Sequence, residues 1–232
     1  MKQKTPPVVT ITLDESGTKY YPHEALLIKY SPYFEAALTG GFKESTKKEK
    51  ALTIEDTSED TFELFLQWLY AQSDPSSRIL ENLIQLTSEA VDLYVLGDRY
   101  NIPQLRNHTL TALHALCENK PTMVSCGAIE RAFSALPETS GLCRYIVDSY
   151  IRYHSFCNVG SINTTPDEDR AEDLKAYGDL PGEFLARVMF GYKDRLTEKS
   201  PDVEGEWDRE TLKRYLEDEE EVERLKKRRR TS

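Results

Sequence analysis

Alternation of apolar and polar residues near the N-terminus predicts a small sheet. In residues 8–13, β-branched and leucine side chains alternate with threonines, which is the period-two pattern of a half-buried strand. A turn over residues 14–17 leads into an extended stretch over residues 18–21, and Gly17 can supply the positive φ that such a hairpin needs. Residues 51–54 are a third candidate strand. The first quarter of the chain therefore favours a sheet of short strands.

Helical spacing replaces this alternation in most of the remaining chain. Ser31-Pro32 predicts a helix start, because serine caps helix N-termini and proline suits the first turn, and two consecutive glycines predict its end. Residues 62–69 place apolar side chains at i, i+3, i+4 and i+7 after an acidic lead rich in capping residues. Two more helices, over residues 88–100 and from Pro103, are expected to separate because the residue before a proline avoids helical angles.

Apolar residues after position 120 keep helical spacing, without a strand pattern of similar quality. Helices are expected over residues 124–136, 142–156 and 183–196. Residues 78–86 fit either a helix or a strand. From residue 197 charged residues dominate, and an interrupted apolar stripe there predicts a segment that needs a partner helix to become ordered. The stripe consists of Leu212, Tyr215, Leu216, Val222 and Leu225.

An ordered series of motifs over residues 9–116 resembles the BTB/POZ domain. After two strands, the motifs are His23-x-x-Leu26-Leu27, Tyr30-Ser31-Pro32-Tyr33-Phe34, Phe42-x-Glu44-Ser45, Leu52-x-Ile54-x-Asp56, Phe62-x-x-Phe65-Leu66-x-Trp68-Leu69-Tyr70, and the stretch from Leu93 to Leu105. The resemblance implies an α+β fold over residues 8–118, with a small sheet capped by helices. A second similarity, to the helical continuation of small single-BTB proteins, implies an all-helical extension over residues 119–196 packed on that domain. Residues 197–232 would then form a charged helical or disordered tail.

The resemblance also implies a role in protein association. BTB domains bind copies of themselves or other proteins, and many act as substrate adaptors of cullin-3 ubiquitin ligases. In such adaptors a hydrophobic residue and a glutamate, one residue apart, follow the helix that begins at the Ser-Pro position, and Phe42 and Glu44 occupy that place here. Phe42 would fill an apolar pocket and Glu44 would take a charge-assisted hydrogen bond. The expected partners are therefore cullin-3 or another BTB protein.

Two features differ from the better-known BTB proteins. Long forms make homodimers by exchanging an extra N-terminal helix and strand, whereas seven residues precede Val8 here, so we expect that exchanged element to be absent. No kelch, MATH or zinc-finger segment follows the helices, so no familiar substrate-recruiting domain is expected. A homodimer built without the exchanged element stays open at this point.

Composition narrows the class of partner. The 232 residues carry a formal net charge of −10, so the surface repels nucleic acid and anionic lipid and favours protein partners. The longest apolar runs fall far short of the roughly 20 residues that a membrane span needs. Residues 1–7 hold no signal-peptide core. Four cysteines occur singly, so reduced thiols in a nuclear or cytoplasmic protein are expected.

The sequence contains few motifs typical of catalytic, cofactor-binding or metal-binding sites. No phosphate loop, His-Glu-x-x-His, nucleophile elbow or zinc-spaced cysteine pair occurs in the sequence, so we expect no enzyme, no cofactor, no small-molecule substrate and no metal site. His23 lies where a strand turns into a helix, and we expect its neutral ring to pack and to satisfy a backbone group. His154 and Cys157 could supply two ligands, which is too few for a closed zinc site. The alternative, an enzyme hidden in the helical part, predicts a bound cofactor or metal.

A run of five basic residues is the sharpest charge feature of the tail. It consists of Lys226, Lys227, Arg228, Arg229 and Arg230. Such a run is typical of a nuclear localisation signal, of a nucleic-acid contact, or of a solvated helix end. Two functions therefore follow from the sequence: an adaptor or scaffold, including a ubiquitin ligase adaptor, and a nuclear transcription cofactor that combines BTB association with this basic signal.

Overall fold

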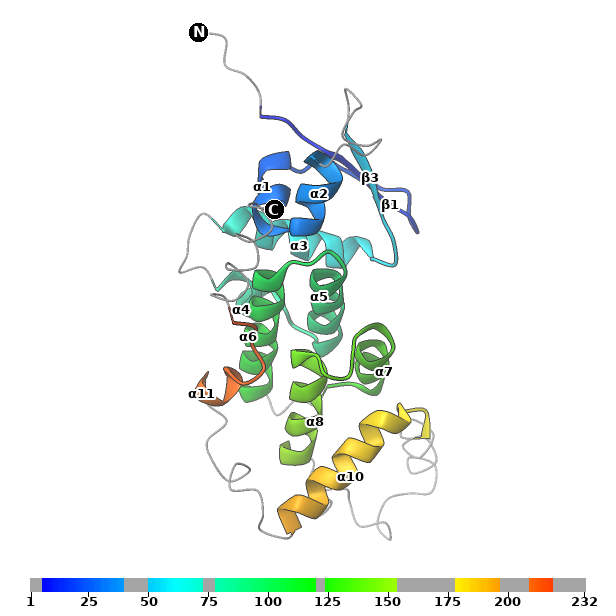
Figure 1. The fold of residues 1–232 in the computed structure, drawn as a ribbon, viewed down its shortest axis with the longest axis vertical. Coiled ribbons are helices and arrows are strands. Elements are labelled where there is room, and N and C mark those ends of the chain that lie inside the picture. Colours follow the sequence, from blue (N-terminus) through cyan, green and yellow to red (C-terminus); the bar gives the residue numbers. More distant parts are fainter. Residues whose placement is uncertain are drawn as a thin grey trace.

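The computed structural model describes residues 6–39, 50–72, 78–119, 124–153, 178–196 and 209–218. In these residues one small sheet lies at one end of a stack of helices (Figure 1). The strands are β1 (Thr10–Leu13), β2 (Lys19–Tyr20) and β3 (Ala51–Ile54). The helices are α1 (Glu24–Tyr30), α2 (Pro32–Thr39), α3 (Glu59–Ala71), α4 (Ile79–Leu83), α5 (Thr87–Arg99), α6 (Pro103–Asn119), α7 (Cys126–Ala135), α8 (Gly141–Tyr153), α10 (Gly182–Leu196) and α11 (Arg209–Leu212). The α+β class is confirmed.

The sheet has the order β2-β1-β3. β1 and β2 pair antiparallel as the expected hairpin, and Gly17 takes a φ of 70° in the connecting turn. β3 pairs with β1 in parallel, so that Ile11 lies opposite Leu52. The inward side chains of β1, Ile11 and Leu13, are fully buried. The alternation in the sequence thus identifies the buried face of the sheet correctly.

Helix α2 begins as its sequence predicts, and its cap also ties it to a distant helix. The buried hydroxyl of Ser31 accepts a hydrogen bond from the Phe34 amide (3.1 Å) and donates to the Tyr100 carbonyl (2.6 Å). Phe34 is buried as expected. The aromatic pair Tyr33-Phe34 at a helix start predicts two core anchors, but 45% of Tyr33 is exposed. Since consecutive helical residues point about 100° apart, only one of the two rings can face the core.

Helix α3 supplies the centre of the core. The Ser58 hydroxyl caps it by accepting from the Thr61 amide. On the predicted apolar face Phe62, Phe65 and Leu69 are buried, and Leu66 is partly buried. Trp68, one position before Leu69 and outside the i, i+3, i+4, i+7 series, is also fully buried. Its indole nitrogen donates to His108 Nδ1 at 2.9 Å, which joins α3 to α6. A buried indole N–H needs such a partner.

The following helices resolve one ambiguity and confirm one break. Residues 79–83 form the helix α4, so the apolar segment that fitted either element is helical. The break between α5 and α6 falls at Asn101, which has a φ of 49°, and the Ile102 amide returns to the Gly97 carbonyl (2.7 Å). Helix α5 starts at Thr87, one residue earlier than predicted, because the Glu89 carboxylate accepts from the Leu86 amide at 3.0 Å.

The later helices continue the same stack. Helix α7 packs on α5, α8 packs on α7, and α10 packs on α8 at the end opposite the sheet (Figure 1). Phe184 of α10 is fully buried between the rings of Phe133 and Tyr150, with centroids 5.6 and 5.1 Å away. In the described residues the extension therefore shares one hydrophobic core with the first half of the chain.

Candidate protein-interaction surface

The two sets of residues that the sequence singled out lie outside the described residues. Phe42 and Glu44 belong to the connection between α2 and β3, and Lys226–Arg230 belong to the tail beyond residue 218. Two other candidates, His154 and Cys157, also fall outside. The structure does define the two ends from which the connection carrying Phe42 and Glu44 departs.

These two ends are tied together by one lysine. The Lys50 ammonium donates to the Leu38 carbonyl near the end of α2 and to a Glu24 carboxylate oxygen of α1, both at 2.7 Å. The Lys50 carbonyl also accepts from the Thr10 amide at 2.9 Å, which fixes it to β1. The connection over residues 40–49 therefore leaves from, and returns to, one small region formed by α1, α2 and the sheet.

An exposed aromatic ring stands on α2, the helix that precedes this connection. The Tyr33 ring contacts the rings of Phe34 and Tyr100 edge-on, with centroids 5.4 and 5.2 Å away. Phe34 and Tyr100 are buried and stack on each other. Tyr33 is thus a half-exposed aromatic side chain held on a rigid base, the kind of residue that is enriched in protein interfaces.

His23 has a packing role, but its partner differs from the one expected. Its ring Nδ1 lies 2.8 Å from the Tyr70 hydroxyl of α3, and the same hydroxyl accepts from the His23 amide at 3.1 Å. We expected the imidazole to satisfy a backbone group, whereas a tyrosine hydroxyl satisfies both the ring and the amide. The arrangement joins the start of α1 to the end of α3.

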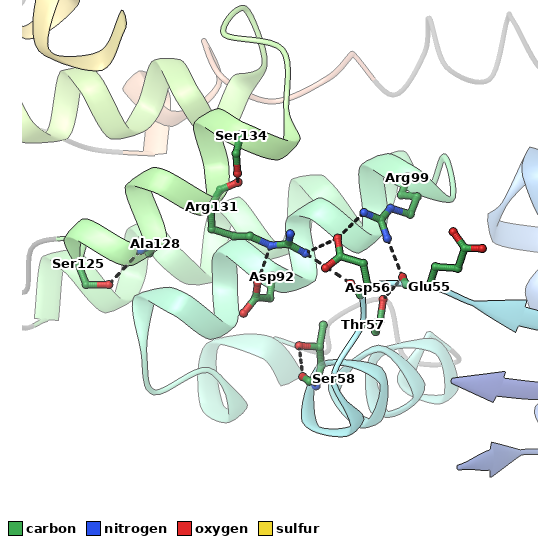
Figure 2. A network of polar contacts seen from close by, with 11 residues as sticks. Glu55, Asp56, Thr57, Ser58, Asp92, Arg99, Ser125, Ala128, Arg131 and Ser134 are labelled. Atoms are coloured by element: carbon green, nitrogen blue, oxygen red, sulfur yellow. Dashed lines mark hydrogen bonds and ion pairs between the residues drawn. The ribbon is translucent and has the colours of Figure 1, made fainter. Parts of the chain in front are cut away.

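A charged network links the sheet end of the molecule to the helical extension (Figure 2). One carboxylate oxygen of Asp56, just after β3, accepts from Arg99 of α5 at 2.6 Å and from Arg131 of α7 at 2.9 Å. Arg131 also donates to Asp92 of α5 at 3.2 Å, and Arg99 donates to the Glu55 carbonyl at 2.6 Å. Three parts of the chain therefore converge on one aspartate.

The pKa shifts in this network indicate that its ion pairs stabilise the contact between the residues after β3 and the helices α5 and α7. Burial alone would raise the pKa of Asp56, but hydrogen bonds from Arg99 and Arg131 outweigh it, so the pKa lies below its usual value. Burial raises the pKa of Asp92 despite the neighbouring Arg131. Asp56 itself has a φ of 50°, a left-handed conformation that Asp and Asn tolerate better than most residues. One oxygen of its carboxylate accepts from both arginines.

Within the part of the chain that the structure describes, no three His, Cys, Asp or Glu side chains group closely enough to hold a metal ion. None of the helices in those same ranges combines the length and apolar character that crossing a bilayer requires. These residues present the half-exposed ring of Tyr33 on α2 and, close to it, the two ends of the 40–49 connection held by Lys50. Both features lie at the sheet end of the helical stack (Figure 1).

Comparison with known protein families identifies the family to which this fold belongs. Residues 1–116, half of the chain, match the BTB/POZ domain. The chain belongs to the BTB/POZ family. The resemblance read from the motifs is thereby confirmed, and so is the coarse function, because BTB/POZ domains are protein–protein interaction modules and are generally not enzymes. The remaining helices of this BTB/POZ protein extend the matched domain.

Sequence reasoning missed most of the charged network that braces this BTB/POZ domain. Asp56 was part of a motif, but its partners Arg99 and Arg131 lie 43 and 75 residues further along the chain. A lone arginine on a predicted helix looks like any solvated surface residue. The one local signal was an aspartate two residues after a strand, in a position suited to an unusual backbone angle.

Proposed function

We propose that this BTB/POZ protein is a substrate adaptor of a cullin-3 type ubiquitin ligase and that Phe42 and Glu44 contact the cullin. The observation that carries the proposal is the position of this pair. Both residues belong to the connection whose two ends Lys50 holds against α1, α2 and the sheet. A loop with fixed ends loses less conformational entropy when it binds a partner than a loop with free ends does.

The chemistry of the pair suits a protein partner. Phe42 would contribute an aromatic anchor for an apolar pocket, and Glu44 would supply a carboxylate for a charge-assisted hydrogen bond. The exposed ring of Tyr33 on α2 would extend the same contact surface. A small number of buried anchors of this kind carries most of the affinity in a typical interface.

A pull-down of the purified chain with purified cullin-3 tests the proposal. The parent chain should retain cullin-3, and Phe42→Ala and Glu44→Ala should each weaken the binding at least tenfold, a loss of about 1.4 kcal/mol or more. Lys43→Ala is the matched control, since it changes the residue between the two and should bind like the parent. Absence of binding by a folded parent chain would retire the ligase role and leave an adaptor for other proteins.

The basic run Lys226–Arg230 supports a second proposal, that the protein acts in the nucleus as a transcription cofactor. The run lies in the tail beyond residue 218, outside the described residues. A cluster of five cations is the chemistry that nuclear importers read. A fluorescently tagged chain with these five residues changed to alanine should shift from nucleus to cytoplasm relative to the tagged parent. Identical distributions would remove the nuclear proposal and leave the adaptor proposal intact.

A further inference from the structure

The segment over residues 209–218 follows α11 back to the helical stack (Figure 1). Glu217 and Tyr215 bond to residues of α6 and α8 that precede them by 110 and 67 positions in the sequence. The sequence stripe was expected to need a partner helix, and two of its members, Leu212 and Tyr215, are buried by this chain itself. The other described residues from 211 to 218 remain half-buried or exposed. The contact thus resembles a short peptide held in a groove more than a packed element of a core.

The side-chain amide of Asn107 binds the backbone of the C-terminal segment. Asn107 of α6, which is only 6% exposed, donates from its amide nitrogen to the Glu217 carbonyl at 3.0 Å. Its amide oxygen accepts from the Glu217 N–H at 2.8 Å. An asparagine that satisfies both backbone groups of one residue reproduces the pairing that a neighbouring strand would offer. It holds the peptide backbone at this residue whatever its side chain.

A second side chain selects an acidic residue at that same position. The guanidinium of Arg106 pairs with both carboxylate oxygens of Glu217: Nε donates to Oε1, and Nη2 donates to Oε2 at 2.7 Å. Arg106 is 8% exposed and is held in place by the Gly97 carbonyl at 3.0 Å. Burial would lower the pKa of Arg106, but Glu217 outweighs this effect and raises it. A buried, pre-positioned guanidinium fork is a recognition element for a carboxylate.

A third contact selects the tyrosine two residues earlier. The Tyr215 hydroxyl donates to Asp148 of α8 at 2.7 Å, and its ring meets the buried Tyr145 ring edge-on, with centroids 5.6 Å apart. Gly141, at the start of α8, leaves room for the peptide backbone: a Cβ there would lie 2.1 Å from the Tyr215 carbonyl oxygen. The surface under the segment therefore admits main chain at Gly141 and offers the Asp148 carboxylate to a phenol hydroxyl.

We propose that this groove is a peptide-binding site for segments with the chemistry Leu-x-x-Tyr-x-Glu, and that residues 212–217 are its resident, exchangeable ligand. A partner protein that displays such a segment would compete with the tail for Arg106, Asn107 and Asp148. The resident segment has the advantage of its covalent tether, which gives it a high effective concentration. An external peptide therefore binds well only when the tail has been released. This site is independent of Phe42 and Glu44.

The test uses the full-length chain with its tail released by a single substitution. Glu217→Arg sets two cations against each other at Arg106, and Tyr215→Ala is a second releasing variant that removes the phenol and its hydrogen bond. A fluorescein-labelled peptide with the sequence of residues 209–218 is the probe, followed by fluorescence anisotropy. Circular dichroism and the thermal transition of each variant report whether the rest of the protein stays folded.

The peptide should bind the released chains in a saturable manner and at least about tenfold more tightly than it binds the parent chain. Adding Asn107→Ala to a released chain, or replacing the peptide's tyrosine or glutamate by alanine, should weaken binding by a similar factor. A peptide with the same residues in scrambled order is the control and should show no saturable binding.

Four results would overturn the proposal. Absence of saturable binding to folded, released chains would mean that the groove accepts only its tethered segment. Equal binding to the parent and the released chains, or no effect of Asn107→Ala, would place the peptide elsewhere. Loss of the cooperative thermal transition in both released variants would make residues 209–218 an integral part of the fold instead of an exchangeable ligand.

Discussion

The substitution Gly141→Ala tests most directly how tightly the C-terminal segment is fitted to the helical stack. The new methyl group would lie 2.1 Å from the carbonyl oxygen and 3.2 Å from the carbonyl carbon of Tyr215. These are backbone atoms, so no side-chain rotation can relieve the overlap. The Tyr215 backbone must move away from α8, and its hydrogen bond to Asp148 must lengthen or break.

Two opposing effects determine how much Gly141→Ala changes the free energy of unfolding. Alanine is favoured over glycine within a helix by up to about 1 kcal/mol. Forcing an extra methyl group into a packed contact costs about 1–3 kcal/mol. The free energy of global unfolding should therefore fall by about 0–2 kcal/mol. The local effect should be larger, because the segment can leave as a unit: we expect amide exchange in residues 211–218 to accelerate by at least about tenfold, which corresponds to about 1.4 kcal/mol.

Urea unfolding and hydrogen–deuterium exchange with mass spectrometry measure the two quantities. Gly127→Ala is the matched control, since Gly127 also lies in the first turn of a helix and a Cβ added there would meet no heavy atom within 4 Å. The control should leave exchange in residues 211–218 unchanged and should not lower stability. If Gly141→Ala left that exchange at the parent rate, or if both alanines accelerated it equally, the close approach of Tyr215 to α8 would be refuted.

Four further substitutions, with Ser134→Ala as a control, probe the contacts around the sheet. Asp56→Asn keeps a residue that tolerates the positive φ but removes the charge shared by two arginines, and it should cost about 0.5–1 kcal/mol at pH 7 in urea unfolding, after allowing for solvent screening. Because the folded protein lowers the pKa of Asp56, that contribution is present above the usual value of 3.8 and is lost as the pH falls through the lower folded value; a deficit that persisted at pH 2 would contradict this assignment. Ser31→Ala removes a buried hydroxyl with two partners and should cost about 1–3 kcal/mol, whereas Ser134→Ala, at an exposed site, should stay within about 0.5 kcal/mol of the parent in the same assay. Phe34→Ala should cost about 3–5 kcal/mol, and Tyr33→Ala less than about 1.5 kcal/mol; equal losses in thermal unfolding would mean that both rings are core residues.

Much of the local structure of this BTB/POZ protein follows from the sequence alone. Ser31-Pro32 fixes the start of α2, and the spacing of residues 62–69 fixes the buried face of α3. The proline at 103 fixes the break before α6. Each depends on groups a few residues apart, so a capping hydroxyl, a missing N–H or a 3.6-residue period carries the whole cause. The ordered motifs also sufficed for the family. The roles of Phe42, Glu44 and Lys226–Arg230 stay predictions.

Tertiary packing determined the remaining features, because they depend on which residues far apart in the sequence come into contact. Periodicity could not tell that Tyr33 would face outward while Phe34 faced inward. Nor could it pair Asp56 with Arg131, since nothing local distinguishes an arginine that braces two helices from one that faces water. The same limit hid Glu217, one acidic residue in a strongly charged tail, until the fold placed its carboxylate against Arg106. An ion pair or a backbone clamp between residues far apart in sequence exists only once the elements that carry them have packed, so the groove that holds residues 212–217 is a property of the folded chain.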